Sequence, residues 1–209
     1  MAKKWIGYIG VGSLMCAALG CGILYTRQAR LQQAISDKVL RFHVLANSDS
    51  EADQTLKLAV RDRVLQEYGD LLETCTSKEE TLAALKNAQQ EISETAEAEV
   101  LAQGYTYPVR VSLVREEFPF KKYGDLIFPA GVYDALRIEI GEAKGKNWWC
   151  VLYPQMCYVD AAWGYSTEES HVRLQNTLTK EEFLVVSAME QKKVTPKIKC
   201  RLVELWSGR

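Results

Sequence analysis

The 209-residue chain has few histidines and no excess of positive charge. It contains two histidines, and its 26 lysines and arginines are balanced by 27 aspartates and glutamates. Nucleic-acid-binding proteins normally carry a basic field, so this balance argues against a nucleic-acid partner. The composition, 47% hydrophobic and 25% charged, is that of a globular protein with one ordinary domain and extensions.

The chain also lacks the cysteine spacing of a structural zinc site. Such sites pair cysteines about two to four residues apart, whereas six residues separate Cys150 from Cys157. We therefore expect neither a metal nor another cofactor. Cys75, Cys150, Cys157 and Cys200 allow three pairings, and the sequence does not choose between them. Disulfides persist in oxidising compartments outside the cytosol. If the chain is exported, a bond between Cys150 and Cys157 would therefore close a loop over Pro154.

A phosphate-binding loop is missing as well. Gly141 to Asn147 reads GEAKGKN, with one residue too few between the glycines. Asn147 also replaces the hydroxyl residue that would hold magnesium. We interpret this stretch as a hairpin turn and expect no small-molecule substrate.

Charge is absent from Trp5 to Tyr25, a run of 21 residues. At about 1.5 Å per residue this run is long enough to cross a bilayer. A cleavable signal peptide usually has a shorter apolar region, so we prefer an uncleaved anchor. Ala18–Leu19–Gly20 before Cys21 leaves cleavage open. Residues 1–25 are thus a membrane anchor or signal peptide, and residues 26–38 are expected to form a polar tether.

Three helices are predicted from capping boxes, in which a Ser or Thr precedes a Glu by three residues. The pairs are Ser48/Glu51 for a helix over 51–68 ended by Gly69, Ser77/Glu80 for one reaching Gly104, and Thr179/Glu182 for a short one to about 190. Apolar residues recur about every four positions in the first two. These are therefore long amphipathic helices.

Alternation of apolar and polar residues predicts strands at 39–46, 109–113, 136–140 and 148–153, with a last one after Pro196. Residues 118–124 read as a loop of mixed apolar and basic residues that packs on the domain or rests on lipid headgroups. The fold class is therefore α+β: an N-terminal transmembrane or signal helix, then a mostly antiparallel sheet packed against two long amphipathic helices. The α+β signalling domain spans 39–157, a linker or surface excursion 158–178, and a C-terminal helix and strand 179–209.

Two groups of residues invite a chemical interpretation. Successive side chains of a strand point to opposite faces, so Trp148 and Trp149 are both buried only if both faces are covered. Otherwise one of them reaches an interface. Carboxylates that could serve acid–base chemistry are Asp49, Asp53, Asp125, Asp134 and Asp160. Any globular protein of this size has as many, so a catalytic pair is not favoured.

Two blocks carry more specific motifs. The first is LRFHVLANSDS from Leu40 to Ser50, followed by DQxLK from Asp53 and VRD from Val60. The second comprises YGD from Tyr123, FPAG from Phe128 and GxNWWCVL from Gly145, with Pro154 and Cys157 beyond it. In these residues the chain resembles the stage II sporulation protein R family of endospore-forming Gram-positive bacteria. The matching positions are Asn47, Ser48, Asp49, Tyr123, Gly124, Pro129, Gly131, Asn147, Trp148, Trp149, Cys150 and Cys157.

The resemblance implies an exported signal and not an enzyme. Such proteins act in the space between the forespore and mother-cell membranes. There they activate, by direct binding, a membrane-embedded aspartic protease that processes a sigma factor precursor. Our candidates for partner contact are Phe118, Phe120, Tyr123, Lys146, Asn147, Trp148 and Trp149, whereas Ser48, Asp49 and Gly131 look structural. Two alternatives stay open: a secreted hydrolase using Cys150 or a carboxylate pair, and a passive membrane-anchored scaffold.

Overall fold

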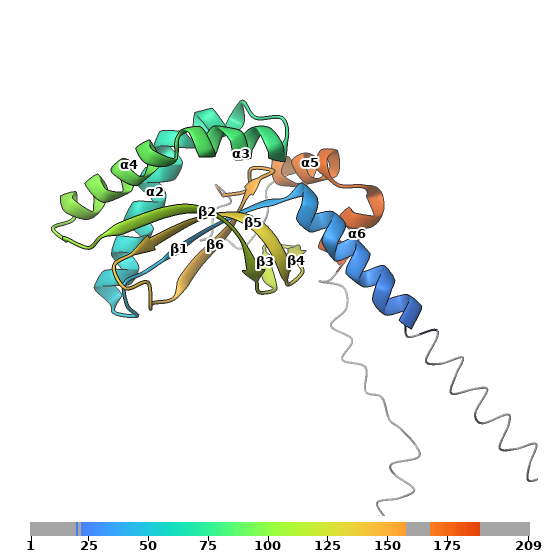
Figure 1. The fold of residues 1–209 in the computed structure, drawn as a ribbon. Coiled ribbons are helices and arrows are strands. Elements are labelled where there is room, and N and C mark those ends of the chain that lie inside the picture. Colours follow the sequence, from blue (N-terminus) through green and yellow to red (C-terminus); the bar gives the residue numbers. More distant parts are fainter. Residues whose placement is uncertain (1–19, 21, 158–167, 189–209) are drawn as a thin grey trace, which may run out of the picture.

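The computed structural model describes residues 20, 22–157 and 168–188 (Figure 1). The predicted last strand and all but the end of the predicted anchor lie outside these residues. Within the described ranges, no helix has the length and apolar character needed to cross a bilayer. The architecture is α+β, as the sequence predicts.

A mixed four-stranded sheet forms the centre, in the order β2-β5-β1-β6. Its strands are β1 (Leu40–Leu45), β2 (Val109–Phe118), β5 (Gly131–Ile140) and β6 (Asn147–Tyr153). The pairs β2–β5 and β1–β6 are antiparallel, whereas β1 and β5 run parallel. The mostly antiparallel sheet is thus confirmed, with a parallel pair at its centre.

The hairpin expected at Gly141–Asn147 is wrong, because β1 lies between β5 and β6. The loop instead crosses the end of β1. The Gly145 N–H donates to the Ala46 carbonyl at 2.9 Å, and the Lys144 N–H donates to the Asn47 carbonyl at 3.2 Å. The crossing therefore joins the two motif blocks of the sequence.

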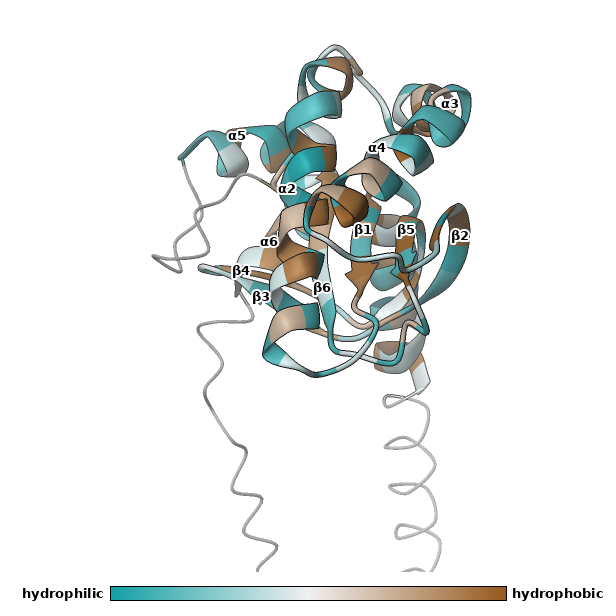
Figure 2. Ribbon diagram, turned by 90° about the vertical axis from the view of Figure 1, so that its left-hand side faces the viewer, coloured by the Kyte–Doolittle hydropathy of each residue, from teal (hydrophilic) through white to brown (hydrophobic). Residues whose placement is uncertain are grey.

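Three helices cover one face of the sheet: α2 (Glu51–Glu73), α3 (Lys78–Asn87) and α4 (Gln89–Ala102) (Figure 1). Leu56, Val60, Ile92 and Ala96 pack there against Phe42 and Ile138, and all six are buried. Figure 2 shows brown apolar residues concentrated in β1 and β5 and in the neighbouring helix segments. This layer contains the larger of the two cores.

The boundaries of these helices differ from the predicted ones. Ser50, not Ser48, caps α2, because its Oγ accepts the Asp53 N–H at 3.1 Å. The helix does not end at Gly69, because burial of Leu72 beyond it favours another turn. The second predicted helix starts after Ser77 as expected but breaks at Ala88 into α3 and α4.

A second core lies on the opposite face. It is formed by a helix over residues 22–38, by α5 (Glu168–Thr177) and α6 (Lys180–Ala188), and by a two-stranded sheet of β3 (Lys121–Tyr123) and β4 (Leu126–Phe128). The prediction of a polar tether at 26–38 is therefore wrong, because Ile35 and Ser36 are fully buried. The loop at 118–124 is likewise wrong, because most of it belongs to β2 and β3.

The C-terminal predictions are partly confirmed. The linker at 158–178 is wrong where α5 occupies it, since Leu174 of α5 is buried in the second core, and residues 158–167 lie outside the described part. The capping box at Thr179 is confirmed as the start of α6. The Thr179 N–H donates to Glu182 Oε2 at 2.7 Å, and the Glu182 N–H donates to Thr179 Oγ1 at 3.4 Å.

Candidate partner-binding face

The second face of the sheet is only partly covered. Strand register places three rows of side chains on it, each crossing β2, β5, β1 and β6: Val114–Ala135–Arg41–Val151, then Ser112–Arg137–His43–Trp149, then Arg110–Glu139–Leu45–Asn147. Ala135, Arg41 and Val151 of the first row are buried beneath the second core. No side chain of the last row is buried, and Arg110 is 71% exposed. We call Leu45, Arg110, Arg137, Glu139, Asn147 and Trp149 the open sheet face.

Trp149 stands at the boundary between the covered and open rows. Its ring stacks on His43, with centroids 4.9 Å apart and planes 13° apart, and meets the edge of Phe118 at 4.7 Å. The Lys121 ammonium lies 5.4 Å from the same ring. Trp149 is therefore held on several sides while the residue stays partly exposed, an arrangement suited to an interface.

Trp148 points to the other face. Its ring contacts Phe42 edge-on at 5.6 Å, and the Arg61 guanidinium lies 4.7 Å from it. Each tryptophan thus packs against a different core and neither is fully buried. The prediction that one of them contacts a partner stays a prediction.

His43 forms the floor beneath Trp149. It is 2% exposed, and its Nε2 lies 2.6 Å from Glu116 Oε1. Burial lowers the pKa of His43, and this effect outweighs the opposite influence of the Glu116 carboxylate. The imidazole is therefore neutral near pH 7, and it supports the tryptophan as a flat ring without a full charge.

Arg41 is fully buried in the neighbouring row. Its guanidinium carbon lies 4.7 Å from the centre of Phe118 and 5.2 Å from that of Tyr133. Nε donates to the Cys150 carbonyl at 3.0 Å, and Nη2 donates to the Tyr123 hydroxyl at 2.8 Å. This cation is thus stabilised by aromatic faces and neutral acceptors, which ties β1 to β6 and to β3.

The predicted partner contacts on β2, on β3 and at the turn between them differ in how exposed their side chains are. Phe118 is 2% exposed, so the prediction that it contacts a partner is wrong: its ring fills the core beside Arg41. Tyr123 is half-buried, and burial raises its pKa despite the nearby Arg41 cation. Phe120 is 52% exposed, at the turn between β2 and β3 and not on the open sheet face.

The first motif block holds the loop that leads into β6. Asn47 Nδ2 and Ser48 Oγ both donate to the Asp53 carboxylate, at 2.9 and 2.5 Å, and these two bonds lower the pKa of Asp53. Asn47 Oδ1 accepts the Glu142 N–H at 2.9 Å. Asp49 Oδ1 accepts the Lys146 N–H at 2.7 Å. Asn47, Ser48 and Asp49 therefore fix the backbone before Asn147 and leave the Lys146 side chain exposed.

The remaining motif positions shape turns around the second core. Gly124 adopts a φ of +62°, and the Pro129 carbonyl accepts the Tyr133 hydroxyl at 2.8 Å. A Cβ at Gly131 would meet the Gln32 amide of the helix over residues 22–38. These residues position the second core and do not reach the open sheet face.

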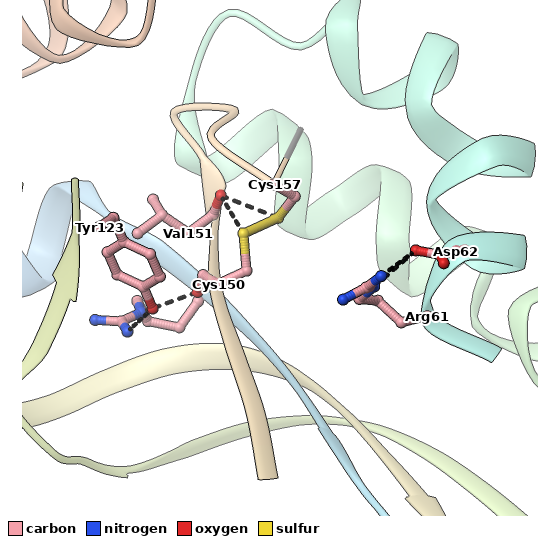
Figure 3. The surroundings of a disulfide bond; sticks show 7 residues. Arg61, Asp62, Tyr123, Cys150, Val151 and Cys157 are labelled. Atoms are coloured by element: carbon pink, nitrogen blue, oxygen red, sulfur yellow. Dashed lines mark hydrogen bonds and ion pairs between the residues drawn. A yellow bond between two sulfur atoms is a disulfide. The ribbon is translucent and has the colours of Figure 1, made fainter. Parts of the chain in front are cut away.

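Cys150 and Cys157 form a disulfide, the candidate pairing that closes the loop over Pro154 (Figure 3). Cys150 is 2% exposed and bonded, so it is not available as a nucleophile. Figure 3 shows Tyr123 on one side of β6 and the Arg61–Asp62 pair on the other. Cys150 belongs to the first core and Cys157 packs against it, so the bridge lies on the helix-covered face of the sheet.

Comparison with known proteins identifies the family of the chain. A family model described as stage II sporulation protein R matches residues 36–163. The stage II sporulation protein R of Bacillus subtilis (strain 168) is 33% identical over 180 residues, which are 81% of this chain and 80% of that relative. The chain belongs to the stage II sporulation protein R family. No solved structure matches it.

Within the stage II sporulation protein R family, the matched region contains the whole open sheet face. It runs from Ser36, in the last turn of the N-terminal helix, to beyond Cys157. The sheet, α2 to α4 and the disulfide all lie inside it, whereas α5 and α6 lie outside. Membership in this family supports a role in sporulation signalling.

The carboxylates considered for catalysis have structural partners. Asp53 accepts the two bonds described above, and Asp134 Oδ2 lies 2.7 Å from Lys78 Nζ. Asp125 pairs with His171 at 3.0 Å, and Asp160 lies outside the described residues. The described part of the chain contains no group of three metal-binding side chains.

Sequence reasoning missed Arg41 and His43. Both interrupt the apolar strand LRFHVL at alternate positions, which places them on the face opposite Leu40, Phe42 and Val44. Two polar residues at a spacing of two, in a strand buried on both faces, were the available signal.

Proposed function

We propose that this chain is an exported sporulation signalling protein that activates a membrane-embedded aspartic protease by direct binding. The protease in turn processes a sigma factor precursor. The protein would act in the space between the forespore and mother-cell membranes, either anchored by its N-terminal segment or released. Family membership supports the signalling role, and the open sheet face is our candidate for the contact.

The exposed part of Trp149 is the observation that carries this proposal. Binding energy at protein interfaces concentrates in a few aromatic and arginine side chains, which are most effective when held in place beforehand. Trp149 is held by His43, Phe118 and Lys121. Around it the charges of the open sheet face are balanced, because Arg137 lies 3.3 Å from Glu116 and Arg110 lies 3.3 Å from Glu139.

The disulfide gives independent support for export. Disulfides persist in oxidising compartments and are rare in the cytosol. The bond between Cys150 and Cys157 has its Cα atoms 5.6 Å apart, within the usual range. An extracytoplasmic site of action is the compartment in which such a bond is maintained.

A coexpression experiment tests the proposal. The full chain, a candidate protease and a sigma factor precursor are produced together in a non-sporulating host, and precursor processing is followed by immunoblot. Arg110→Glu should reduce processing about tenfold, because it reverses a charge on the open sheet face, and a tenfold loss corresponds to about 1.4 kcal/mol of binding. Its stability should hardly change, because Arg110 is 71% exposed and surface ion pairs contribute little.

Arg63→Glu is the matched control. Arg63 lies on α2, on the other side of the sheet, and its side chain is 45% exposed. This variant should activate normally. Absence of processing by the wild-type chain, with export verified, would refute direct activation, and equal effects of both substitutions would refute the open sheet face as the contact.

A further inference from the structure

An apolar groove lies in the second layer, beside the helix over residues 22–38. Its volume is about 710 Å³, and its apolar lining includes Leu24, Tyr25, Leu31, Phe120, Pro129 and Val185. These residues come from the helix over 22–38, the two ends of the β3–β4 unit and α6. The groove is therefore a feature of the folded domain and not of the N-terminal segment alone.

Large apolar side chains around the groove are exposed. Leu24 is 67% exposed, Tyr25 76% and Phe120 52%. Every residue from 22 to 30 is exposed, so the first turns of the helix stand clear of the domain, whereas Ile35 is buried in it. Large apolar groups exposed together in this way mark a surface that contacts a protein, a membrane or a ligand.

Basic residues accompany these apolar ones. Arg27 lines the groove, and its guanidinium is 3.6 Å from the Glu181 carboxylate. Lys121 and Lys122 directly follow Phe120 in the chain, and Lys122 is exposed. Exposed apolar and aromatic side chains combined with arginine and lysine are typical of surfaces that rest in the headgroup region of an anionic bilayer.

The sequence identifies lipid as the occupant in preference to a protein. The charge-free run from Trp5 to Tyr25 is long enough to cross a bilayer, and its last residues, Leu24 and Tyr25, line the groove. If that run spans the bilayer, the groove begins where the run ends, at the level of the headgroups. In Figure 1 the helix over 22–38 runs outward from the domain next to β3, β4 and α6.

We propose that the groove, together with Phe120, Lys121 and Lys122, is a platform that docks the folded domain on an anionic lipid bilayer. This platform goes beyond the proposed function, because it requires lipid and no protease. Docking would fix the orientation of the domain on the membrane. Attachment through the N-terminal segment alone would leave the domain free to rotate.

Site-specific fluorescence on the full chain tests the platform. A genetically encoded environment-sensitive fluorescent amino acid is placed at position 120, and the protein is reconstituted into phosphatidylcholine vesicles with or without phosphatidylglycerol. Nitroxide-labelled lipids should quench the probe at 120 when phosphatidylglycerol is present. The same probe at position 101 is the control, because Leu101 is 63% exposed at the end of α4, on the helix layer. It should not be quenched.

Charge variants provide the second measurement. Lys121→Gln with Lys122→Gln should lower the ratio of docked to undocked domain about tenfold or more, because each lysine near an anionic surface contributes about 1 kcal/mol. Lys144→Gln, in the loop over 141–147, should leave the ratio unchanged. Equal quenching at 120 and 101, or quenching independent of phosphatidylglycerol, would overturn the platform. So would shielding of position 120 from iodide without quenching by the lipids, which would mean that a second copy or another segment of this chain fills the groove.

Discussion

Arg41 is the residue on which the packing of the second core depends. Its guanidinium is fully buried and contacts four aromatic rings, from Phe118, Tyr123, Phe128 and Tyr133. Among the described residues no carboxylate pairs with this buried cation, and such a cation is costly unless rings and acceptors surround it closely. We infer that the aromatic content of β2 to β5 is in part the environment that this cation requires.

Arg41→Ala should lower the free energy of unfolding by about 3 kcal/mol, comparable to other large-to-small core truncations. The change removes the ring contacts and leaves the Cys150 carbonyl and Tyr123 hydroxyl without their donor. Urea denaturation followed by tryptophan fluorescence measures the effect. Arg63→Ala, which breaks an exposed pair with Glu67, should change stability by less than about 0.5 kcal/mol. Equal effects of the two substitutions would contradict the role of Arg41.

His43 should make stability depend on pH in a defined window. Its pKa in the folded state lies below the ordinary value of 6.5, chiefly because of burial. Between these two values the unfolded chain binds more protons, so stability is full above about pH 6.5 and falls as the pH drops below it. The contribution of Asp53 is separate, because its pKa is lowered from 3.8 and its stabilisation is lost only in stronger acid.

Urea midpoints measured from pH 7.5 to 5 should therefore decrease for the wild-type chain, and His43→Phe should flatten that decrease. Phenylalanine keeps a flat ring beneath Trp149 but takes up no proton. Arg63→Ala should retain the wild-type slope. A slope that persists in His43→Phe would show that another group controls stability in this range.

Among the secondary-structure elements, those with local signals were predicted from the sequence. β1, β6, the cap at Ser77 and the cap at Thr179 all follow from alternation or capping boxes within a few residues. The helix over 22–38 was missed because it is mostly polar and only a few residues, such as Ile35, anchor it. The continuation of α2 past Gly69 is likewise decided by packing of Leu72 and not by propensity.

The order of the strands could not be predicted from local signals. Placing β1 between β5 and β6 depends on contacts between residues far apart in sequence, such as Gly145 with Ala46. The candidate site shows the same division. Asn147 and Trp149 were singled out from the sequence, whereas the supporting roles of Arg41 and His43 became visible only when the register of four strands was known.

Gly145 is the position at which the crossing over β1 is most sensitive. A Cβ there would overlap the Ser48 carbonyl, and the Gly145 N–H is bonded to Ala46. Gly145→Ala should therefore displace the loop and lower the free energy of unfolding by at least about 2 kcal/mol, as overpacking of a tight contact does. Denaturation curves measure the loss, and faster hydrogen exchange of the Lys146 amide should accompany it.

Gly104→Ala is the matched control for that substitution. Gly104 has a φ of +84°, but a Cβ there would meet nothing within 4 Å. Only the backbone strain of the left-handed conformation applies, which costs about 1 kcal/mol. If Gly145→Ala were no more harmful than Gly104→Ala, the close approach between the two motif blocks would not hold.

At the scale of the whole molecule, the central sheet separates two layers that differ in how much of the sheet they cover. α2 to α4 form a large core with one face, and the second layer covers only part of the other face. The disulfide joins the middle of β6 to the segment after it, on the side of the first core, because Cys150 belongs to that core and Cys157 packs against it. Because both cores share one sheet, its removal should weaken the molecule as a unit and not one layer alone.

The double variant Cys150→Ala, Cys157→Ala should lower the free energy of unfolding by about 2.5 kcal/mol, the chain-entropy value for so short a loop. Because the cores on both sides remain, the variant should still fold, and its urea transition should remain single, with far-ultraviolet and fluorescence signals changing together.

Cys75→Ser is the control, because Cys75 is a free thiol outside both cores, and it should shift the midpoint little. Two separate transitions in the double variant would mean that the bond, and not the shared sheet, couples the layers. An unchanged midpoint would mean that the bridge contributes nothing to the stability of the folded domain.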